Sequence, residues 1–211
     1  MDENGRKYDM YVVKEYKSRK ILFEKLTKVI REELSLALRK KRKVTLAVPG
    51  GTTPKLLFNA LSLEKIEWKR VVVIPTDERC VDESDSRSNG RFIRSNLLIN
   101  YAKDALYNGL SLPDCSPSEI VDRCKKDIGS NLPIDVCILG MGVDMHIASI
   151  FPDSDRLDEA LAVGTHEILV PIDAPSLSET RITLTAEVLK GSGSLHIIFT
   201  GYEKKVAFEK S

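Results

Sequence analysis

The sequence predicts an α/β fold in which a mainly parallel β-sheet carries helices on both faces. Two observations lead to this prediction. Short apolar segments rich in β-branched residues alternate along the chain with longer segments of helical periodicity. The apolar segments contain almost no polar residues, which is typical of parallel strands that are buried on both faces.

Composition limits the class of protein and its partners. No internal repeat or low-complexity linker interrupts the 211 residues, so we expect residues 1–211 to form a single domain. Lys and Arg total 32 against 31 Asp and Glu, which argues against a nucleic-acid partner or an anionic membrane. The apolar runs are too short for a membrane span, the first residues are polar, and four cysteines lack metal-site spacing. These features predict a cytoplasmic protein with reduced thiols.

The first predicted elements are a strand and a long helix. Met10 to Val13 is apolar and is interpreted as a strand. Ser18 is placed to cap a helix whose apolar stripe runs from Ile21 to Leu38. The basic run 39–43 closes this helix, where cations complement the helix dipole. We favour this interpretation over a nucleic-acid site because no aromatic residues interleave the run.

Two strand-to-helix units follow. Val44 to Val48 predicts a strand that runs through a Gly-Gly turn into a helix starting at Pro54. Val71 to Ile74 predicts the next strand. A polar loop then leads to Ser88, and a helix is expected from there through Ile99.

The second half of the chain repeats this alternation. Residues 116–119, Ser-Pro-Ser-Glu, form a capping box with proline at the first helical position, so a helix begins there. Ile134 to Leu139 is the next strand, and Ile168 to Val170 is expected to be extended. Leu195 to Thr200 predicts a late strand, which leads into a helix from Glu203 onward.

The first segment with chemical potential is the loop after Val48. Gly50 and Gly51 precede two hydroxyl residues, Thr52 and Thr53, and a proline that opens a helix. Free backbone N–H groups and the positive helix end would there face an anion, most naturally a phosphate. The alternative is an ordinary tight turn between a strand and a helix, and the loop alone does not separate the two.

The second segment is Thr76-Asp77-Glu78-Arg79, again at a strand end. Arg79 could bind phosphate through its planar fork of donors, and Asp77 and Glu78 could handle protons or contact sugar hydroxyls. A surface cluster of ion pairs is the alternative. Asn89, at the start of the next helix, could contact a ligand or serve only as a helix cap.

The third segment follows the strand that ends at Leu139. Gly140 and Gly142 permit a sharp turn or close approach to a ligand, and Asp144 and His146 follow within six residues. Ligands in open α/β sheets bind past the carboxyl ends of strands, so His146 is a candidate general base. A structural histidine is the alternative. A nicotinamide site is disfavoured, because position 145 is Met where the dinucleotide fingerprint requires Gly.

Two later segments each place a cation beside a strand end or a helix start. Arg181 lies in Thr-Arg-Ile-Thr-Leu-Thr at 180–185, and Lys204 lies in Thr-Gly-Tyr-Glu-Lys-Lys at 200–205. Each side chain is either a salt-bridge partner or a phosphate ligand. His166 and His196 are interpreted as structural.

Taken together, these segments resemble the 6-phosphogluconolactonase family, which hydrolyses the lactone of the oxidative pentose phosphate pathway. The related glucosamine-6-phosphate isomerases share the general plan. The resemblance covers nearly the whole chain, and several ordered motifs are more specific than any one of them. The matching motifs are Gly-Gly-x-Thr-Pro at 50–54, Asp-Glu-Arg at 77–79, Ser-Asn at 88–89, Gly-x-Gly-x-Asp-x-His-x-Ala-Ser-x-Phe-Pro at 140–152, Arg-Ile-Thr-Leu-Thr at 181–185 and Thr-Gly-x-x-Lys at 200–204.

The resemblance implies a Rossmann-like fold close to that of the sugar-phosphate isomerases, with no metal and no cofactor. It implies hydrolysis of 6-phospho-D-glucono-1,5-lactone, with His146 as general base and Asp144 as its support. The Gly50–Thr53 loop, Arg79 and Lys204 would hold the 6-phosphate, with Arg181 as a further candidate. The other implied substrate-binding residues are Asp77, Asn89 and Gly142. We expect a phosphosugar lactone as partner and a monomer or weak homo-oligomer.

The sequence departs from the family pattern in three places. Met145 replaces the usual Gly before His146, and Ile147 replaces the usual Thr. Met145 would demand an ordinary backbone conformation where Gly permits positive φ, so we expect a slightly different loop. Family members usually continue through a further helix and strand, so the single domain is expected to lack that C-terminal pair.

Rival functions remain from other classes. A glucosamine-6-phosphate isomerase or deaminase needs the same phosphate loop, but in that family Asn-Glu-Pro typically follows the histidine segment. This chain has Ile-Phe-Pro at 150–152, which favours the lactonase. A non-catalytic phosphosugar-binding module would bind without turnover, and intact Asp144 and His146 argue against it. A nicotinamide dehydrogenase is the weakest alternative.

Overall fold

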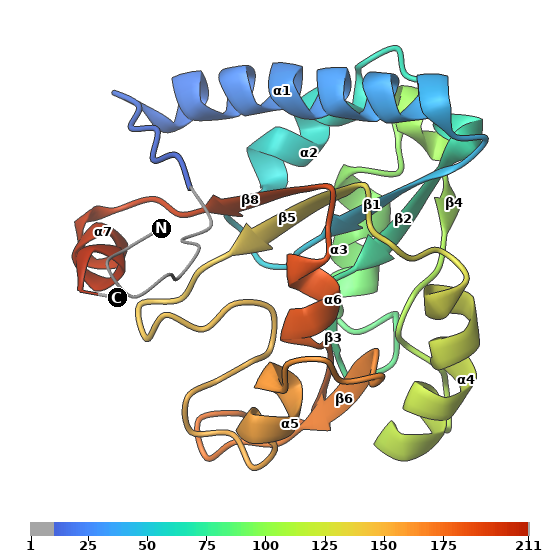
Figure 1. The fold of residues 1–211 in the computed structure, drawn as a ribbon, viewed down its shortest axis with the longest axis vertical. Helices are drawn as coiled ribbons and strands as arrows, with labels where there is room; N and C mark the ends of the chain where they lie inside the picture. The colour runs from blue at the N-terminus through green and yellow to red at the C-terminus, as the bar shows by residue number, and fades with distance from the viewer. Residues whose placement is uncertain (1–10, 211) are drawn as a thin grey trace.

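The computed structural model describes residues 11–210, and its centre is a five-stranded parallel sheet (Figure 1). The strand order is β4-β2-β1-β5-β8, and all four neighbouring pairs are parallel. The predicted α/β fold with a mainly parallel sheet is therefore confirmed. The strands are β1 (Val44–Val48), β2 (Val71–Pro75), β4 (Leu106–Tyr107), β5 (Val136–Gly140) and β8 (Ser194–Ile198).

Seven α-helices lie in the described residues. Serine caps that the sequence predicted mark the starts of three of them. Ser18 accepts a hydrogen bond from the Ile21 N–H, Ser88 caps the third helix, and Ser116 forms the predicted capping box with Glu119. The helices are α1 (Arg19–Lys40), α2 (Lys55–Ser62), α3 (Asn89–Asn96), α4 (Pro117–Gly129), α5 (Leu157–Leu161), α6 (Ala186–Lys190) and α7 (Tyr202–Glu209), with 3-10 turns at Trp68–Arg70 and Asn100–Asp104.

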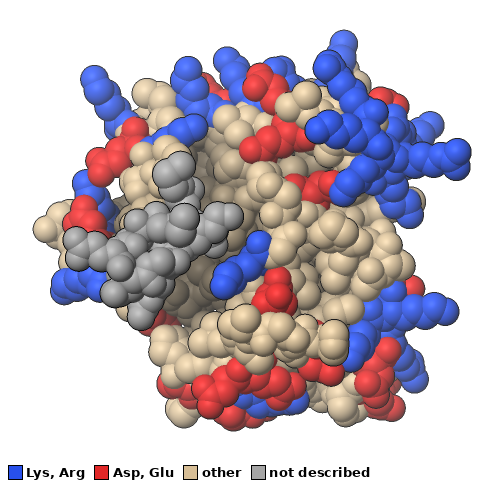
Figure 2. All heavy atoms as spheres, in the orientation of Figure 1, with Lys and Arg blue, Asp and Glu red and all other residues tan. Residues whose placement is uncertain are grey.

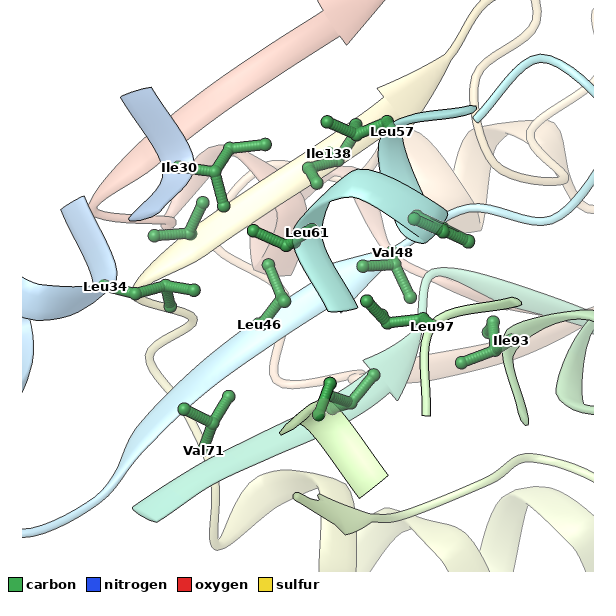
Figure 3. Close-up of a cluster of buried hydrophobic side chains, with 14 of the residues drawn as sticks. Ile30, Leu34, Leu46, Val48, Leu57, Leu61, Val71, Ile93, Leu97 and Ile138 are labelled. Carbon is green, nitrogen blue, oxygen red and sulfur yellow. The ribbon is translucent and has the colours of Figure 1, made fainter. Parts of the chain in front are cut away.

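The core divides into two layers because side chains alternate across each strand. Leu46 and Val48 pack on the face covered by α1, α2 and α3, where Ile30 and Leu61 meet them (Figure 3). Ala47 points to the opposite face, which is covered by α4, α6 and a second sheet. Every side chain of β1 is buried, as expected for a strand covered on both faces.

The second sheet is small, antiparallel and absent from the sequence-based prediction. Its order is β3-β7-β6, with β3 at Asp77–Arg79, β6 at Leu169–Ile172 and β7 at Arg181–Leu184. β3 begins two residues after β2 ends, so the second sheet lies beside the carboxyl end of the central one. This arrangement brings the two predicted segments at 77–79 and 181–185 together.

One predicted strand is not formed, and one predicted helix is shorter than expected. Tyr11 to Val13 form no strand and are exposed, while Met10 lies outside the described residues. The helix after Ser88 ends at Asn96 rather than Ile99, because the chain then enters a 3-10 turn. No helix among residues 11–210 is both long enough and apolar enough to cross a bilayer.

The basic run that follows α1 is a helix end. Figure 2 shows Lys and Arg side chains gathered at the upper right, where α1 ends in Figure 1. The Lys41 Nζ lies 2.6 Å from the Asp135 carboxylate, and Arg70 donates to the Leu38 and Lys41 carbonyls at 2.6 and 2.7 Å. Arg70 thus satisfies carbonyls that the end of the helix leaves without partners.

Candidate active site

The candidate site lies past the carboxyl ends of β1, β2 and β5, where the loops 49–54, 76–88 and 141–152 begin (Figure 1). Ligands of open parallel sheets bind at this edge. We call residues 141–152 the catalytic loop. A groove of about 440 Å³ lies between its Val143 and Met145 and the length of α7 with its C-cap, from Tyr202 to Lys210.

Asp144 and His146 form a hydrogen-bonded pair in the catalytic loop. The His146 Nδ1 lies 2.6 Å from the Asp144 Oδ1, and the same oxygen accepts from the His146 backbone N–H at 3.4 Å. Burial acts to raise the pKa of Asp144, but the hydrogen bond and charge of His146 outweigh it and lower that pKa. An imidazole that donates from Nδ1 to a carboxylate presents its Nε2 lone pair as a base. No hydrogen bond to Nε2 occurs within residues 11–210.

Gly142 is required by the close packing of this pair. A Cβ at position 142 would overlap the Asp144 carboxylate and the His146 ring. The Gly142 N–H also donates to the His146 carbonyl at 2.9 Å, which closes the loop on itself. Gly142 therefore permits close packing of side chains in its own loop, and its expected approach to a ligand stays a prediction.

Met145 adopts φ +67°, in the left-handed region, and this corrects the expectation of an ordinary backbone conformation. The loop keeps the conformation that Gly would favour, with Met in it. The hydrogen bonds that Gly142 makes across the turn, to the His146 carbonyl and from the Met145 N–H, enforce it. The side chain projects outward and is about half exposed at the groove.

Met145→Gly is expected to stabilise the protein by roughly 0.5–1 kcal/mol. A left-handed non-glycine residue costs roughly 1–2 kcal/mol, and part of the gain is lost to the greater freedom of Gly in the unfolded chain. Urea denaturation of both proteins at one pH measures the difference. A less stable Met145→Gly protein would mean that side-chain contacts in the groove outweigh the backbone strain.

Arg79 and Arg181 are directly opposite one another in the β3–β7 ladder. Like charges at such positions repel, and burial followed by the charge of Arg79 lowers the pKa of Arg181. The Nε atoms of both guanidinium groups are buried, and neither has a hydrogen-bond partner among the described residues. The nearest carboxylate to Arg181 is that of Glu179, at 4.0 Å, and Arg79 Nη1 donates to the Arg87 carbonyl. Such a pair has the charge and the free donors to hold an anion.

Phe151 connects the arginine pair to the catalytic loop. Its ring centroid lies 4.1 Å from that of His146, and the Arg181 Cζ lies 5.8 Å from the same Phe151 ring. The Phe151 ring therefore lies against the candidate base and beside one arginine of the candidate anion site. Phe151 was not among the residues predicted for the site. Its position in the Phe-Pro end of the motif was the only available signal.

The Gly50–Thr53 loop lies against Asn89. A Cβ on Gly50 would overlap the Asn89 amide, so only glycine permits this contact, and Gly51 follows at φ +80°. The Asn89 Nδ2 donates to the Asp77 carbonyl at 2.8 Å, while its buried Oδ1 has no partner within residues 11–210. Thr52 is exposed and Thr53 is partly exposed at the start of α2. The loop thus carries accessible donors beside a free amide oxygen.

The carboxylates of Asp77 and Glu78 are both buried and accept hydrogen bonds from the protein itself. Asp77 is 5% exposed, and its two carboxylate oxygens accept from Thr76 Oγ1 at 3.0 Å and Ser149 Oγ at 2.7 Å. Glu78 is fully buried, and it accepts from the N–H groups of Asn89 and Gly90 at 2.7 and 2.6 Å. Burial raises the pKa of Glu78, and these helix N–H groups only partly counter it. Glu78 therefore caps α3 from a distant strand, a role that no local spacing signals.

Lys204 lies in α7, and its side chain reaches the residue that follows β5. Its Nζ donates to the Met141 carbonyl at 2.7 Å, and the side chain is partly buried. The hydrogen bond of Lys204 is therefore with the start of the catalytic loop, whereas Arg79 and Arg181 lie in the second sheet.

Comparison with known proteins agrees with the geometry. A family model described as glucosamine-6-phosphate isomerases/6-phosphogluconolactonase matches residues 17–211. A 6-phosphogluconolactonase of Mesorhizobium japonicum is 38% identical over 85% of this chain and 76% of its own. One from Neisseria meningitidis serogroup A is 32% identical over 96% of this chain and 88% of its own.

A solved structure gives the same result. The crystal structure of a 6-phosphogluconolactonase from Shewanella baltica has a TM-score of 0.91, with 31% identity over 96% of this chain and 86% of that one. The sheet order, the catalytic loop and these similarities agree. The chain belongs to the glucosamine-6-phosphate isomerase/6-phosphogluconolactonase family.

Proposed function

We propose that the protein hydrolyses 6-phospho-D-glucono-1,5-lactone to 6-phospho-D-gluconate, the second step of the oxidative pentose phosphate pathway. The observation that carries the proposal is the Asp144–His146 pair, in which the His146 ring packs on Phe151, and Phe151 in turn lies beside Arg181 of the arginine pair. A base beside an anion site is what hydrolysis of a phosphorylated ester requires. The relatives named 6-phosphogluconolactonase support the choice of substrate.

His146 is the proposed general base. Its Nε2 takes a proton from a water molecule as that water attacks C1 of the lactone. Asp144 holds the ring through Nδ1 and stabilises the imidazolium that forms, a role suited to its lowered pKa. The tetrahedral intermediate then collapses with cleavage of the bond between C1 and the ring oxygen. His146 returns the proton to that leaving oxygen.

The lactone carries one anionic group, its 6-phosphate, and two sets of donors are proposed for it. Thr52, Thr53 and the glycine N–H groups of their loop face the 6-phosphate together with Lys204, while Arg79 and Arg181 present a second set of donors. The free Oδ1 of Asn89 is a proposed acceptor for a sugar hydroxyl. Gly142 contributes backbone beside the reacting carbon.

The isomerase alternative is less well supported. In the isomerases Asn-Glu-Pro typically follows the histidine segment, whereas this chain has Ile-Phe-Pro at 150–152, and Phe151 packs on the His146 ring. The nearest buried carboxylate toward the second sheet is that of Asp77, and both of its oxygens already accept hydrogen bonds. The geometry therefore favours hydrolysis.

The test is hydrolysis of freshly generated 6-phosphogluconolactone, followed as acid release above the spontaneous rate. We expect saturable turnover of the lactone and none of glucosamine 6-phosphate. A rate no higher than the spontaneous one, together with tight binding of 6-phosphogluconate, would instead indicate a binding module. Turnover of glucosamine 6-phosphate would indicate an isomerase.

A further inference from the structure

The catalytic loop has little structure of its own to hold His146 in place. Its backbone hydrogen bonds within the loop close tight turns, with two isolated β-bridges, Met141–Ile147 and Ile147–Ile150. Two non-glycine residues, Met145 and Ala148, have positive φ angles of 67° and 50°. These conformations are unfavourable and persist only where surrounding contacts enforce them. The next residue after Ala148 supplies such contacts.

Ser149 is fully buried and is held at two points by the second sheet. Its Oγ donates to the Asp77 Oδ2 at 2.7 Å, and its backbone N–H donates to the Thr183 Oγ1 at 3.2 Å. Both acceptors are almost fully buried themselves. A hydrogen bond from a hydroxyl to a buried carboxylate is short and strong, so Ser149 has one well-defined position.

The β3–β7 ladder relates this contact to the arginine pair. Asp77 and Thr183 are directly opposite one another, and two residues along each strand lie Arg79 and Arg181. Residues two apart on a strand share a face of the sheet. One face of β3 and β7 therefore carries both the acceptors for Ser149 and the two guanidinium groups.

We propose that Asp77 is a positioning residue that fixes His146 relative to the arginine pair by holding Ser149, and that it does not bind substrate. We call Asp77, Ser149 and Thr183 the latch. The latch joins the catalytic loop to the strands that carry Arg79 and Arg181, so the base and the anion site keep a constant separation. Only the expected effect of the latch on kcat rests on the proposed function.

Ser149→Ala tests the latch without removing the charge of Asp77. We expect kcat for lactone hydrolysis to fall roughly 10–100-fold, because a displacement of about 1 Å at a catalytic group costs this much. KM should stay within about twofold of wild type, since the binding groups remain. Ser62→Ala is the matched control, because Ser62 is also fully buried and donates to a backbone carbonyl, in α2. It should leave both constants unchanged.

Substitutions of Asp77 separate positioning from substrate binding. Asp77→Ala should lower kcat as Ser149→Ala does, and the double variant should be no slower than either single one. Asp77→Asn should recover most of the rate, because its amide oxygen can accept from Ser149 and its NH2 can donate to Thr76. A large rise in KM for Asp77→Ala, an Asp77→Asn protein as slow as Asp77→Ala, or multiplicative effects in the double variant would overturn the proposal.

Hydrogen exchange tests the latch without substrate. In Ser149→Ala, the amide of Gly142, which donates to the His146 carbonyl, should exchange roughly tenfold faster or more, while amides of β1 and β2 are unchanged. Unchanged exchange at Gly142 would overturn the latch even if the enzyme were fast. Faster exchange there in a protein that hydrolyses no lactone would count against the proposed function and not against the latch.

Discussion

His146→Ala is expected to lower kcat for lactone hydrolysis by roughly 10²–10⁴-fold, the usual contribution of a general base. The ring is the only group in the described catalytic loop with a nitrogen lone pair free to accept a proton from water. Its removal leaves the Gly50–Thr53 loop, the arginine pair and Lys204 in place. Binding of 6-phosphogluconate, measured by calorimetry, should therefore change by less than about tenfold, because the lost group acts mainly in the transition state.

The control for this substitution is His166→Ala. His166 is exposed in the segment before β6, and no hydrogen bond or ring contact joins it to the catalytic loop within residues 11–210, so its removal should leave kcat and KM unchanged. Asp144→Asn gives an intermediate case, because the imidazole remains but loses the charge that stabilises its protonated form. A His146→Ala protein that retains wild-type turnover would leave the reaction intact and remove His146 from it.

Replacement of both arginines, Arg79→Ala with Arg181→Ala, is expected to raise KM by roughly 10²–10⁴-fold. Hydrogen bonds to a charged group contribute about 1.5–3 kcal/mol each, and two guanidinium groups would be lost. Arg156→Ala is the matched control, since Arg156 is a half-exposed arginine whose guanidinium pairs with Glu159 alone. Its KM should not change.

The arginine pair also predicts that removal of one arginine stabilises the protein when no anion is bound. Relief of the repulsion between facing guanidinium groups should make Arg181→Met more stable than wild type by a few tenths to about 1 kcal/mol in phosphate-free buffer. Urea denaturation measures this difference. If Arg181→Met both lost stability and kept a normal KM, the arginine pair would be a structural ion-pair cluster, the alternative that the sequence left open.

The sequence predicted four of the five strands of the central sheet, because each of those four carries a local signal, but it missed β4, which has only two residues. Buried strands such as Val71–Pro75 have continuous apolar side chains, and Ser18, Ser88 and Ser116 mark helix starts. The second sheet was missed because β3 has only three residues, all charged, and becomes a strand by pairing with β7. That pairing joins residues about a hundred positions apart, and no local pattern encodes it.

The site was predicted as a set of residues, and their relations came from the structure. The motifs located Asp144, His146 and Arg79, but not that Arg79 faces Arg181 or that Phe151 stacks on His146. Nor did the motifs show that Asp77 and Glu78 have different roles. Both follow an apolar strand, yet one holds Ser149 and the other caps a helix, because alternate residues of β3 point to opposite faces.

The cap that Glu78 places on α3 also bears on how the protein assembles. A helix of eight residues is too short to be stable alone, and its first turn would ordinarily fray. Here the acceptor for the Asn89 and Gly90 amides belongs to β3, which itself depends on β7, almost a hundred residues later in the chain. The helix α3 and the strands β3 and β7 therefore form one cooperative unit. During synthesis, α3 cannot be completed until the chain through β7 has left the ribosome.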